Sequence, residues 1–415
     1  MPPRKPYCPK PHPPLPAIRK PGTMTPALPA SLLRAPGVDV PPTAATPLRP
    51  NLWAVLRDSV GMDLTRIALP VFFNEPLSFL QRLAEDLEYY HLLARAAAAG
   101  PGPTRTALVA AFFVSHYSST AHRASKPFNP LLGETFDLVV PGAFRLVAEQ
   151  VAHHPPISAI HASGDGWTYH TAHEIKNRFK GNSLEVWPEG NVYVTFDDGD
   201  HYVYEQAHTY VHNIIVGGLW LDNVGTVVIR EVSKGKLLAS VKLKRSALLF
   251  GEAKKVGDFS GKVCDVGKGG KAGKVLMKMD GNWNSEVRVD GKSVWTATQR
   301  PTKKDTAGHA MTAWAWGLNT KLEPGVVGSE VPKTDSRLRP DQRALEEGRY
   351  REAAAEKERL EDAQRRKRKE GVCERPRWFE LVDEASTGRK EWKYRGGYFE
   401  CKRERSWPDD LPDIF

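Results

Sequence analysis

Two adjacent histidines, His153 and His154, precede two prolines and follow the carboxylate of Glu149. Proline has no N–H group, holds its φ at about −65°, and pushes the residue before it toward an extended backbone. The segment is therefore stiff and presents two imidazoles at one place. Such a pair can bind a phosphate, bind a metal ion or shuttle a proton.

A second candidate element is residues 126–135, which read KPFNPLLGET. On composition alone this is a turn before a strand. Lys126 can give a point charge to a phosphate, and Asn129 a directed amide, while the prolines hold the two in one arrangement. Beside the two histidines, the element would form half of an anion site.

A charged segment near the C-terminus, residues 344–369, is rich in Glu, Ala, Lys and Arg and predicts a helix. Lys357, Glu361 and Arg365 are four residues apart and share one face of it, which by itself indicates a surface ladder of ion pairs. Its end, residues 365–369, reads RRKRK, which is either a nuclear or phosphate-binding tract or a solvated helix face.

These elements resemble one known family. Residues 149–159 read EQVAHHPPISA, similar to the signature EQVSHHPPISA of the oxysterol-binding protein family, with Ala152 where a serine is usual. Residues 126–135 resemble a second element of that family. Further matches follow in family order at residues 211–217, 334–341 and 376–379. The resemblance spans about residues 51–400.

The resemblance implies a mainly β fold with helices: a large, near-complete antiparallel β-barrel around a hydrophobic tunnel, with a lid and helices on the N-terminal side and a long C-terminal helix. It also implies a site for a phosphoinositide headgroup, in which the acidic residue orients the bases. The matching positions are Lys126, Asn129, His153, His154, Lys357, Glu361 and Arg365. Deep in the tunnel, His116 and Tyr117 match the place where the family holds a sterol hydroxyl. Trp53 and Leu56 are candidates for the lid.

Hydrophobic patterns agree with this fold. Residues 51–60 predict a short amphipathic helix, residues 75–90 a helix that opens at Glu75-Pro76-Leu77, and residues 107–118 an apolar helix. From about residue 127 to residue 298, short runs alternate with period two, as in residues 191–196 and 237–243. Many short strands without intervening helices indicate a large antiparallel sheet or barrel.

The expected organisation is a single lipid-binding domain with tails, and its parts are a tail at 1–50, a lid at about 51–61, helices at 62–125, a barrel at 126–300, C-terminal helices at 340–370 and a second tail at 401–415. Residues 1–50 hold seven Lys/Arg, one acidic residue and 16 of the 33 prolines, so disorder is expected there. That basic tail suits anionic membranes or serves only as a solubilising linker.

Several classes of protein are disfavoured. No run of about 18 apolar residues predicts a transmembrane helix, and the N-terminus lacks the apolar region of a signal peptide. The four cysteines, at positions 8, 264, 373 and 401, are scattered, which favours a reducing cytosolic compartment and argues against structural zinc. No metal, other cofactor or nucleic acid is expected as a ligand.

The resemblance implies a non-enzymatic carrier in the cytosol, peripherally associated with membranes at endoplasmic reticulum, Golgi or plasma membrane contact sites. It would exchange sterol for phosphatidylinositol 4-phosphate, and its protein partners are unknown. One alternative exchanges phosphatidylserine in place of sterol. A hydrolase using His153, His154 and Glu149 lacks a second ligand cluster and a nucleophile elbow. Nucleic-acid binding by the basic tail and residues 365–369 lacks an accompanying recognition motif.

Overall fold

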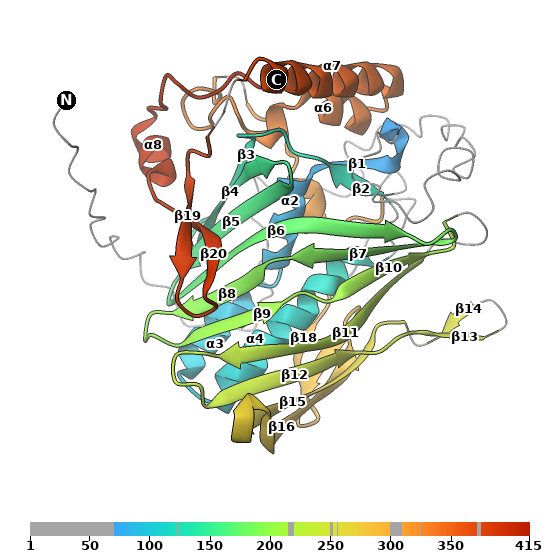
Figure 1. Ribbon diagram of the computed structural model, residues 1–415, viewed down its shortest axis with the longest axis vertical. Helices are drawn as coiled ribbons and strands as arrows, with labels where there is room; N and C mark the ends of the chain where they lie inside the picture. The colour runs from blue at the N-terminus through green and yellow to red at the C-terminus, as the bar shows by residue number, and fades with distance from the viewer. Residues whose placement is uncertain are drawn as a thin grey trace.

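The computed structural model describes residues 70–121, 123, 125–214, 220–249, 252–254, 256–298, 309–323, 325–371 and 375–415. The expected tail at 1–50 and lid at 51–61, including Trp53 and Leu56, lie outside these residues. Figure 1 shows a large curved sheet with helices against its inner side and a long C-terminal helix across one end.

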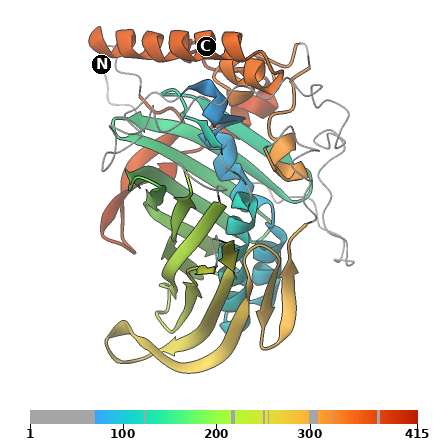
Figure 2. The same cartoon turned by 90° about the vertical axis from the view of Figure 1, so that its right-hand side faces the viewer.

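The N-terminal part of the described chain is mostly helical and lies inside the curve of the sheet (Figure 2). Its helices are α2 (Phe79–Ala84), α3 (His91–Ala99) and α4 (Pro103–His116). α3 ends at Gly100, whose φ of 69° suits glycine, and α4 begins with Pro103, whose fixed φ suits the first helical turn. Because α4 runs through the interior, nearly every one of its side chains is buried.

The helix that the sequence predicts from Glu75 begins later than expected. Residues Asn74–Ser78 form strand β1, which pairs in parallel with β2 (Lys126–Phe128). Helix α2 starts at Phe79, where the side chain of Gln81 accepts a 2.8 Å hydrogen bond from the N–H of Ser78. The prediction of a helix opening at Glu75 is therefore wrong, because strand pairing with the distant Lys126 segment outweighs the local pattern.

In the part of the chain that the structure describes, the main sheet has 14 strands. Its antiparallel order is β18-β17-β16-β15-β12-β11-β10-β7-β6-β5-β4-β3, with β8 and β9 branching from β6 and β11. Their bounds are β3 (Thr135–Val140), β4 (Phe144–His153), β5 (Pro156–Gly164), β6 (Trp167–Phe179), β7 (Ser183–Glu189), β8 (Asn191–Phe196), β9 (His201–Glu205), β10 (His208–His212), β11 (Trp220–Glu231), β12 (Leu237–Leu243), β15 (Asp258–Val266), β16 (Ala272–Asn282), β17 (Glu286–Val289) and β18 (Lys292–Thr296). A two-stranded hairpin, β13 (Ala247–Leu249) and β14 (Glu252–Lys254), stands beside it.

The sheet curves around the helices without closing. In the described residues its first and last strands, β3 and β18, do not pair with each other, and α4 contacts strands β11, β12 and β15 to β18 from the inside. One apolar core joins the inner face of the sheet to α2, α3 and α4, with Phe112 and Phe113 fully buried at its centre. The prediction of a mainly β fold built on a large, incompletely closed antiparallel barrel is confirmed.

The C-terminal part packs against one end and the outer wall of the barrel. The charged segment expected at 344–369 is two helices, α6 (Pro340–Glu346) and α7 (Tyr350–Lys369), separated at Gly348, whose φ is 73°. Short helix α5 (Ala313–Gly317) precedes them. A hairpin of β19 (Phe379–Glu384) and β20 (Arg389–Tyr394) and helix α8 (Tyr398–Glu404) follow. Figures 1 and 2 both place α7 across the end where β3 and β4 meet the 126–135 segment.

Candidate functional site

The two histidines lie where β4 turns into β5. His153 is the last residue of β4 and pairs with Pro156, the first residue of β5, so His154 occupies the turn. Adjacent residues on a regular strand would face opposite sides. Here the turn brings the imidazoles together, with ring centroids 4.5 Å apart and planes at 70°. His153 is half-buried and His154 is exposed, and the peptide bond between His154 and Pro155 is cis.

Helix α7 contacts this turn through Gln364, which the sequence analysis missed. Its amide nitrogen lies 2.9 Å and 3.3 Å from the two ring nitrogens of His153. Because these distances are nearly equal, the amide lies over the ring rather than in line with one nitrogen. The oxygen of the same amide accepts a 2.7 Å hydrogen bond from the N–H of Leu132. Gln364 is three residues after Glu361, and this helical spacing was the available signal.

Three predicted residues gather beside the histidines. Lys357 forms a 2.7 Å ion pair with Glu361 on α7. Lys126 has an exposed side chain, but surrounding protein desolvates its ammonium group. This desolvation and the nearby charge of Lys357 lower the pKa of Lys126 to about 8, against the opposing effect of Glu361. The carboxylate of Glu361 also acts on His153, so it is close enough to influence both the lysines and the histidine.

The protonation states of His153 and His154 depend on burial and on the neighbouring charged groups. Burial, followed by the influence of His154 and Arg368, lowers the pKa of His153 to about 4, although Glu361 opposes this. Burial and Arg368 also lower the pKa of His154. Both rings are therefore neutral at pH 7 in the ligand-free protein, and each offers one N–H donor. Arg368, which the sequence analysis left in the basic tract, is thus part of the surroundings of this turn.

Two predicted members of the set are placed differently. Arg365 pairs with Asp362 rather than with Glu361, and its side chain is 58% exposed. The Asn129 side chain is also exposed. What fixes Asn129 is its backbone, because its carbonyl accepts a 2.9 Å hydrogen bond from Arg339.

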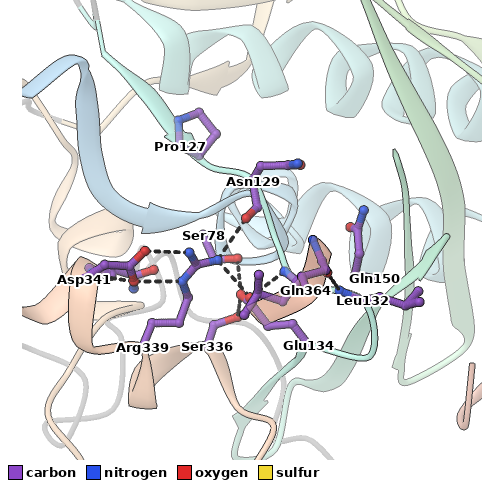
Figure 3. A network of polar contacts seen from close by, with 12 residues as sticks. Ser78, Pro127, Asn129, Leu132, Glu134, Gln150, Ser336, Arg339, Asp341 and Gln364 are labelled. Atoms are coloured by element: carbon purple, nitrogen blue, oxygen red, sulfur yellow. Dashed lines mark hydrogen bonds and ion pairs between the residues drawn. The ribbon is translucent and has the colours of Figure 1, made fainter. Parts of the chain in front are cut away.

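A buried ionic network holds the 126–135 segment in place (Figure 3). Glu134 accepts hydrogen bonds from the hydroxyls of Ser78 and Ser336 and from the N–H of Leu131. Arg339 bridges Glu134 at 2.9 Å and Asp341 at 2.7 Å. Removing one partner of such a buried pair typically costs about 3–5 kcal/mol. The network therefore ties the loop that carries Lys126 and Asn129 to β1, α6 and the start of α2.

A groove of about 520 Å³ opens beside the histidine turn. Its polar lining includes His153, His154, Gln364 and Arg368, and Leu131 and Leu360 form its apolar part with the C-terminal Ile414 and Phe415. Cationic and hydrogen-bond donating groups therefore share one concave surface with a small apolar patch. Such an arrangement suits an anionic group attached to an apolar body.

Glu149 faces away from this site. Its carboxylate is buried and accepts hydrogen bonds of 2.7 Å and 2.9 Å from the N–H groups of Arg377 and Trp378. Burial raises its pKa to about 7, although these backbone bonds oppose the shift. Glu149 therefore anchors the chain before β19, and the grouping of Glu149 with the two histidines in a hydrolase site is wrong. Within the described residues, no three His, Cys, Asp or Glu side chains are arranged to hold a metal ion.

A second polar cluster lies inside the barrel, around the end of α4. His116 is 4% exposed, and in the described structure neither of its ring nitrogens has a hydrogen-bond partner. Its Nδ1 lies 3.8 Å from Asp86, which accepts a 2.8 Å hydrogen bond from Tyr169. Burial lowers the pKa of His116, so the ring is neutral. The buried hydroxyl of Tyr204 also lacks a partner among the described residues.

Tyr117, the other residue predicted for this interior place, has a defined partner. Its hydroxyl accepts a 2.8 Å hydrogen bond from the N–H of Ala207, at the start of β10. Burial raises its pKa. Tyr117 therefore links α4 to the sheet, while His116 and Tyr204 remain as buried polar groups around Asp86. Sequence reasoning missed Asp86 and Tyr204, since neither lies in a recognisable motif.

Comparison with known proteins decides the family. The family model described as oxysterol-binding protein matches residues 51–403 of this chain. The chain belongs to the oxysterol-binding protein family. Among curated members, it is 39% identical over 379 residues to oxysterol-binding protein-related protein 2B of Arabidopsis thaliana, covering 88% of this chain and 52% of that protein. It is 37% identical to oxysterol-binding protein 2 of Mus musculus, covering 88% and 43%. The chain thus spans about half the length of these relatives.

Solved structures of oxysterol-binding family domains share the fold. The Osh1 ORD domain in complex with cholesterol matches with a TM-score of 0.78 and 35% identity, covering 91% of this chain and 93% of that one. The Osh3 ORD of Saccharomyces cerevisiae in complex with PI(4)P matches with a TM-score of 0.77 and 31% identity, covering 91% and 98%. No helix in the described part of this chain is long and apolar enough to span a membrane.

Proposed function

We propose that this protein binds a sterol and phosphatidylinositol 4-phosphate in turn within one barrel and exchanges them between membranes. The observation that carries the proposal is the convergence of Lys126, the histidine turn and α7 at one end of the barrel. The likeness to the Osh1 domain bound to cholesterol and the Osh3 domain bound to PI(4)P supports the two ligands. The protein would act peripherally at membranes in the cytosol.

The end of the barrel suits a phosphomonoester. Such a group carries about −1.5 to −2 charges at neutral pH and needs both charge and directed donors. Lys126 and Lys357 supply charge, Glu361 holds Lys357, and both imidazoles supply N–H donors. A bound phosphate favours the protonated imidazole, so it would raise the pKa of His153 from about 4. Asn129 and Arg365 belong to the proposed set, which Arg365 can join only by giving up its ion pair with Asp362.

The interior cluster suits a single hydroxyl. A buried hydroxyl without a partner costs about 1–3 kcal/mol, so a sterol that enters an apolar barrel needs a polar group at its far end. His116 and Tyr204 are buried and without partners among the described residues, and Asp86 lies between them and Tyr169. We assign the sterol hydroxyl to this cluster. Tyr117 positions it by joining α4 to β10. Trp53 and Leu56 stay in the proposal as lid residues.

The test is an exchange assay with two vesicle populations, one carrying phosphatidylinositol 4-phosphate and the other a fluorescent sterol. The protein should move both lipids in opposite directions, and each lipid should compete with the other for binding. Mass spectrometry of the recovered lipids should find them chemically intact, because the proposal makes and breaks no bond. Simultaneous binding of both lipids, or a hydrolysed product, would overturn it. Phosphatidylserine in place of sterol in the same assay tests the alternative exchanger.

A further inference from the structure

Strands β12, β15 and β16 lie at the opposite end of the molecule from α7 (Figures 1 and 2). Between residues 234 and 278 the sequence holds 12 Lys/Arg and three acidic residues, a net charge of +9 in a chain whose total is +10. Eleven of the 12 are lysines. Four of these lysines lie on the strands themselves, Lys242 on β12, Lys262 on β15, and Lys274 and Lys278 on β16. The outer surface of β12, β15 and β16 is here called the lysine wall.

The register places these lysines on one outer surface. Val241 and Val263 are buried and face the core, so the alternate residues of β12 and β15 face outward. Lys262 stands directly opposite Lys278 on β16, and Lys242 is the diagonal neighbour of Lys262. All three are exposed. Like charges directly opposite one another destabilise a sheet, so this arrangement does not serve the stability of the barrel.

Acidic residues near the lysine wall do not neutralise it. Asp265 and Asp290 accept hydrogen bonds from the backbone N–H groups of Lys274 and Lys278, and Asp280 pairs with Arg288. Across the described residues, no acidic group lies within ion-pair distance of the ammonium groups of Lys242, Lys262 or Lys278. Helix α7 differs, because several of its cations form ion pairs with nearby carboxylates. These pairs are Arg349–Glu352, Lys357–Glu361, Arg359–Glu356 and Arg365–Asp362.

Apolar side chains accompany these charges. On β16, Leu276 is 38% exposed and shares the face of Lys274 and Lys278, whereas Val275, which is 41% exposed, faces the other side of the strand. β17 pairs with β16 only from Met279 to Asn282, so the described strands leave this part of β16 as an edge of the sheet. Lysine stems beside exposed aliphatic side chains suit the boundary between lipid headgroups and acyl chains.

We propose that the lysine wall is a docking surface for an anionic lipid bilayer. Nucleic acid fits less well, since arginine is the preferred residue for phosphate and base recognition and Arg245 is the single arginine among the 12 cations. The lysine ammonium is a compact, hydrated point charge, and each lysine near an anionic membrane contributes about 1 kcal/mol. This membrane-facing surface is distant from the histidine turn. The biological purpose of docking rests on the proposed lipid exchange, but the vesicle binding itself does not.

The experiment measures binding of the full chain to phosphatidylcholine vesicles with and without phosphatidylserine, by co-sedimentation. The test variant replaces Lys242, Lys262 and Lys278 with Gln. The control replaces Arg389, Lys390 and Arg403 with Gln, which are exposed cations elsewhere and change the net charge equally. At about 1 kcal/mol per lysine, the test variant should bind the anionic vesicles on the order of 100-fold more weakly. The control should bind as the wild type does.

Two further measurements distinguish loss of membrane docking from loss of lipid binding. Leu276→Ser should also weaken vesicle binding, without any change of charge. Binding of a fluorescent sterol added without vesicles should be the same in all variants, so failure of the lipid-binding function would appear there and nowhere else. Equal vesicle binding by the test and control variants would overturn the proposal. So would a test variant that loses affinity for a single-stranded oligonucleotide while keeping its affinity for vesicles, which would assign the wall to nucleic acid.

Discussion

The two polar sites of this barrel differ in the cationic groups that they contain. At the end covered by α7, Lys126 is exposed, the two imidazoles share a turn, and Glu361 sits among cations. At the interior cluster, His116 is neutral and buried. A phosphate keeps its charge only where water and cations remain, whereas a hydroxyl needs only neutral partners in a dry place. In the proposed function, one barrel can therefore bind each ligand in turn, with the polar group of each at its own end.

The largest effect should come from the histidine turn. Replacing His153 and His154 together with Ala removes two N–H donors to a charged phosphate, each typically contributing about 1.5–3 kcal/mol. Extraction of phosphatidylinositol 4-phosphate from vesicles should fall by on the order of 1,000-fold, while sterol extraction stays within about twofold. Equal loss of both lipids, in a variant with an unchanged melting temperature, would show that the two ends are one site.

Much of this end could be predicted from sequence, because its residues lie in contiguous motifs. The prolines around His154 and the i, i+4 spacing of Lys357 and Glu361 identify the groups that the fold brings together. Gln364 and Arg368 follow Glu361 by three and seven residues, so helical spacing places them on or near its face. The sequence does not show how far along α7 that face meets the turn. The pairing of Arg365 with Asp362 was also unforeseen, since a ladder of charges offers each arginine more than one acid.

The next effect concerns the charge of Lys126. Lys126→Ala should weaken phosphoinositide binding by about 10- to 150-fold, the equivalent of about 1.5–3 kcal/mol. The pKa of this lysine is lowered to about 8 in the free protein, and a bound phosphate must raise it. Affinity should therefore be flat with respect to this group below about pH 8 and fall as the pH rises above it, by at most about tenfold per pH unit.

Lys126→Arg is the matched control for that pH dependence, because arginine stays charged throughout. Equilibrium binding of a soluble phosphoinositide, measured from about pH 7 to about pH 10, should decline in the wild type and stay level in the arginine variant. Parallel declines in both proteins would show that another group titrates. They would also leave Lys126 without the role assigned to it.

A smaller effect is expected at the interior cluster. Tyr204→Phe removes a hydroxyl that has no partner among the described residues, so sterol affinity should fall by about two- to tenfold, the value of one neutral hydrogen bond. Phosphoinositide binding should not change. Tyr117→Phe provides the contrast, because it leaves the N–H of Ala207 without its acceptor and should lower the melting temperature. Unchanged sterol affinity in Tyr204→Phe would show that the sterol hydroxyl does not bind at this cluster.

The interior cluster was the least predictable part of the molecule. Strands β8 and β12 match the alternating runs at 191–196 and 237–243, so the local pattern of the sheet was readable. The cluster instead joins Asp86, the end of α4 and Tyr204 on β9, segments that come together only when the sheet curves around the helices. The late start of α2 has the same cause, since β1 forms only by pairing with β2, about 50 residues away.

The smallest expected effect is that of Arg365→Ala, which is compared with Lys357→Ala because the sequence pattern does not distinguish the two cations. Lys357 is 13% exposed and held by Glu361, whereas Arg365 is 58% exposed and held by Asp362. An exposed ion pair on a helix contributes only a few tenths of a kcal/mol, so Arg365→Ala should change neither stability nor sterol binding. If Arg365 keeps its pairing when the ligand is bound, phosphoinositide affinity should fall by less than about threefold, against about tenfold or more for Lys357→Ala. Equal losses in the two variants would show instead that Arg365 leaves Asp362 and turns toward the phosphate. Asp362→Asn would then be expected to strengthen binding, because it releases the arginine in advance.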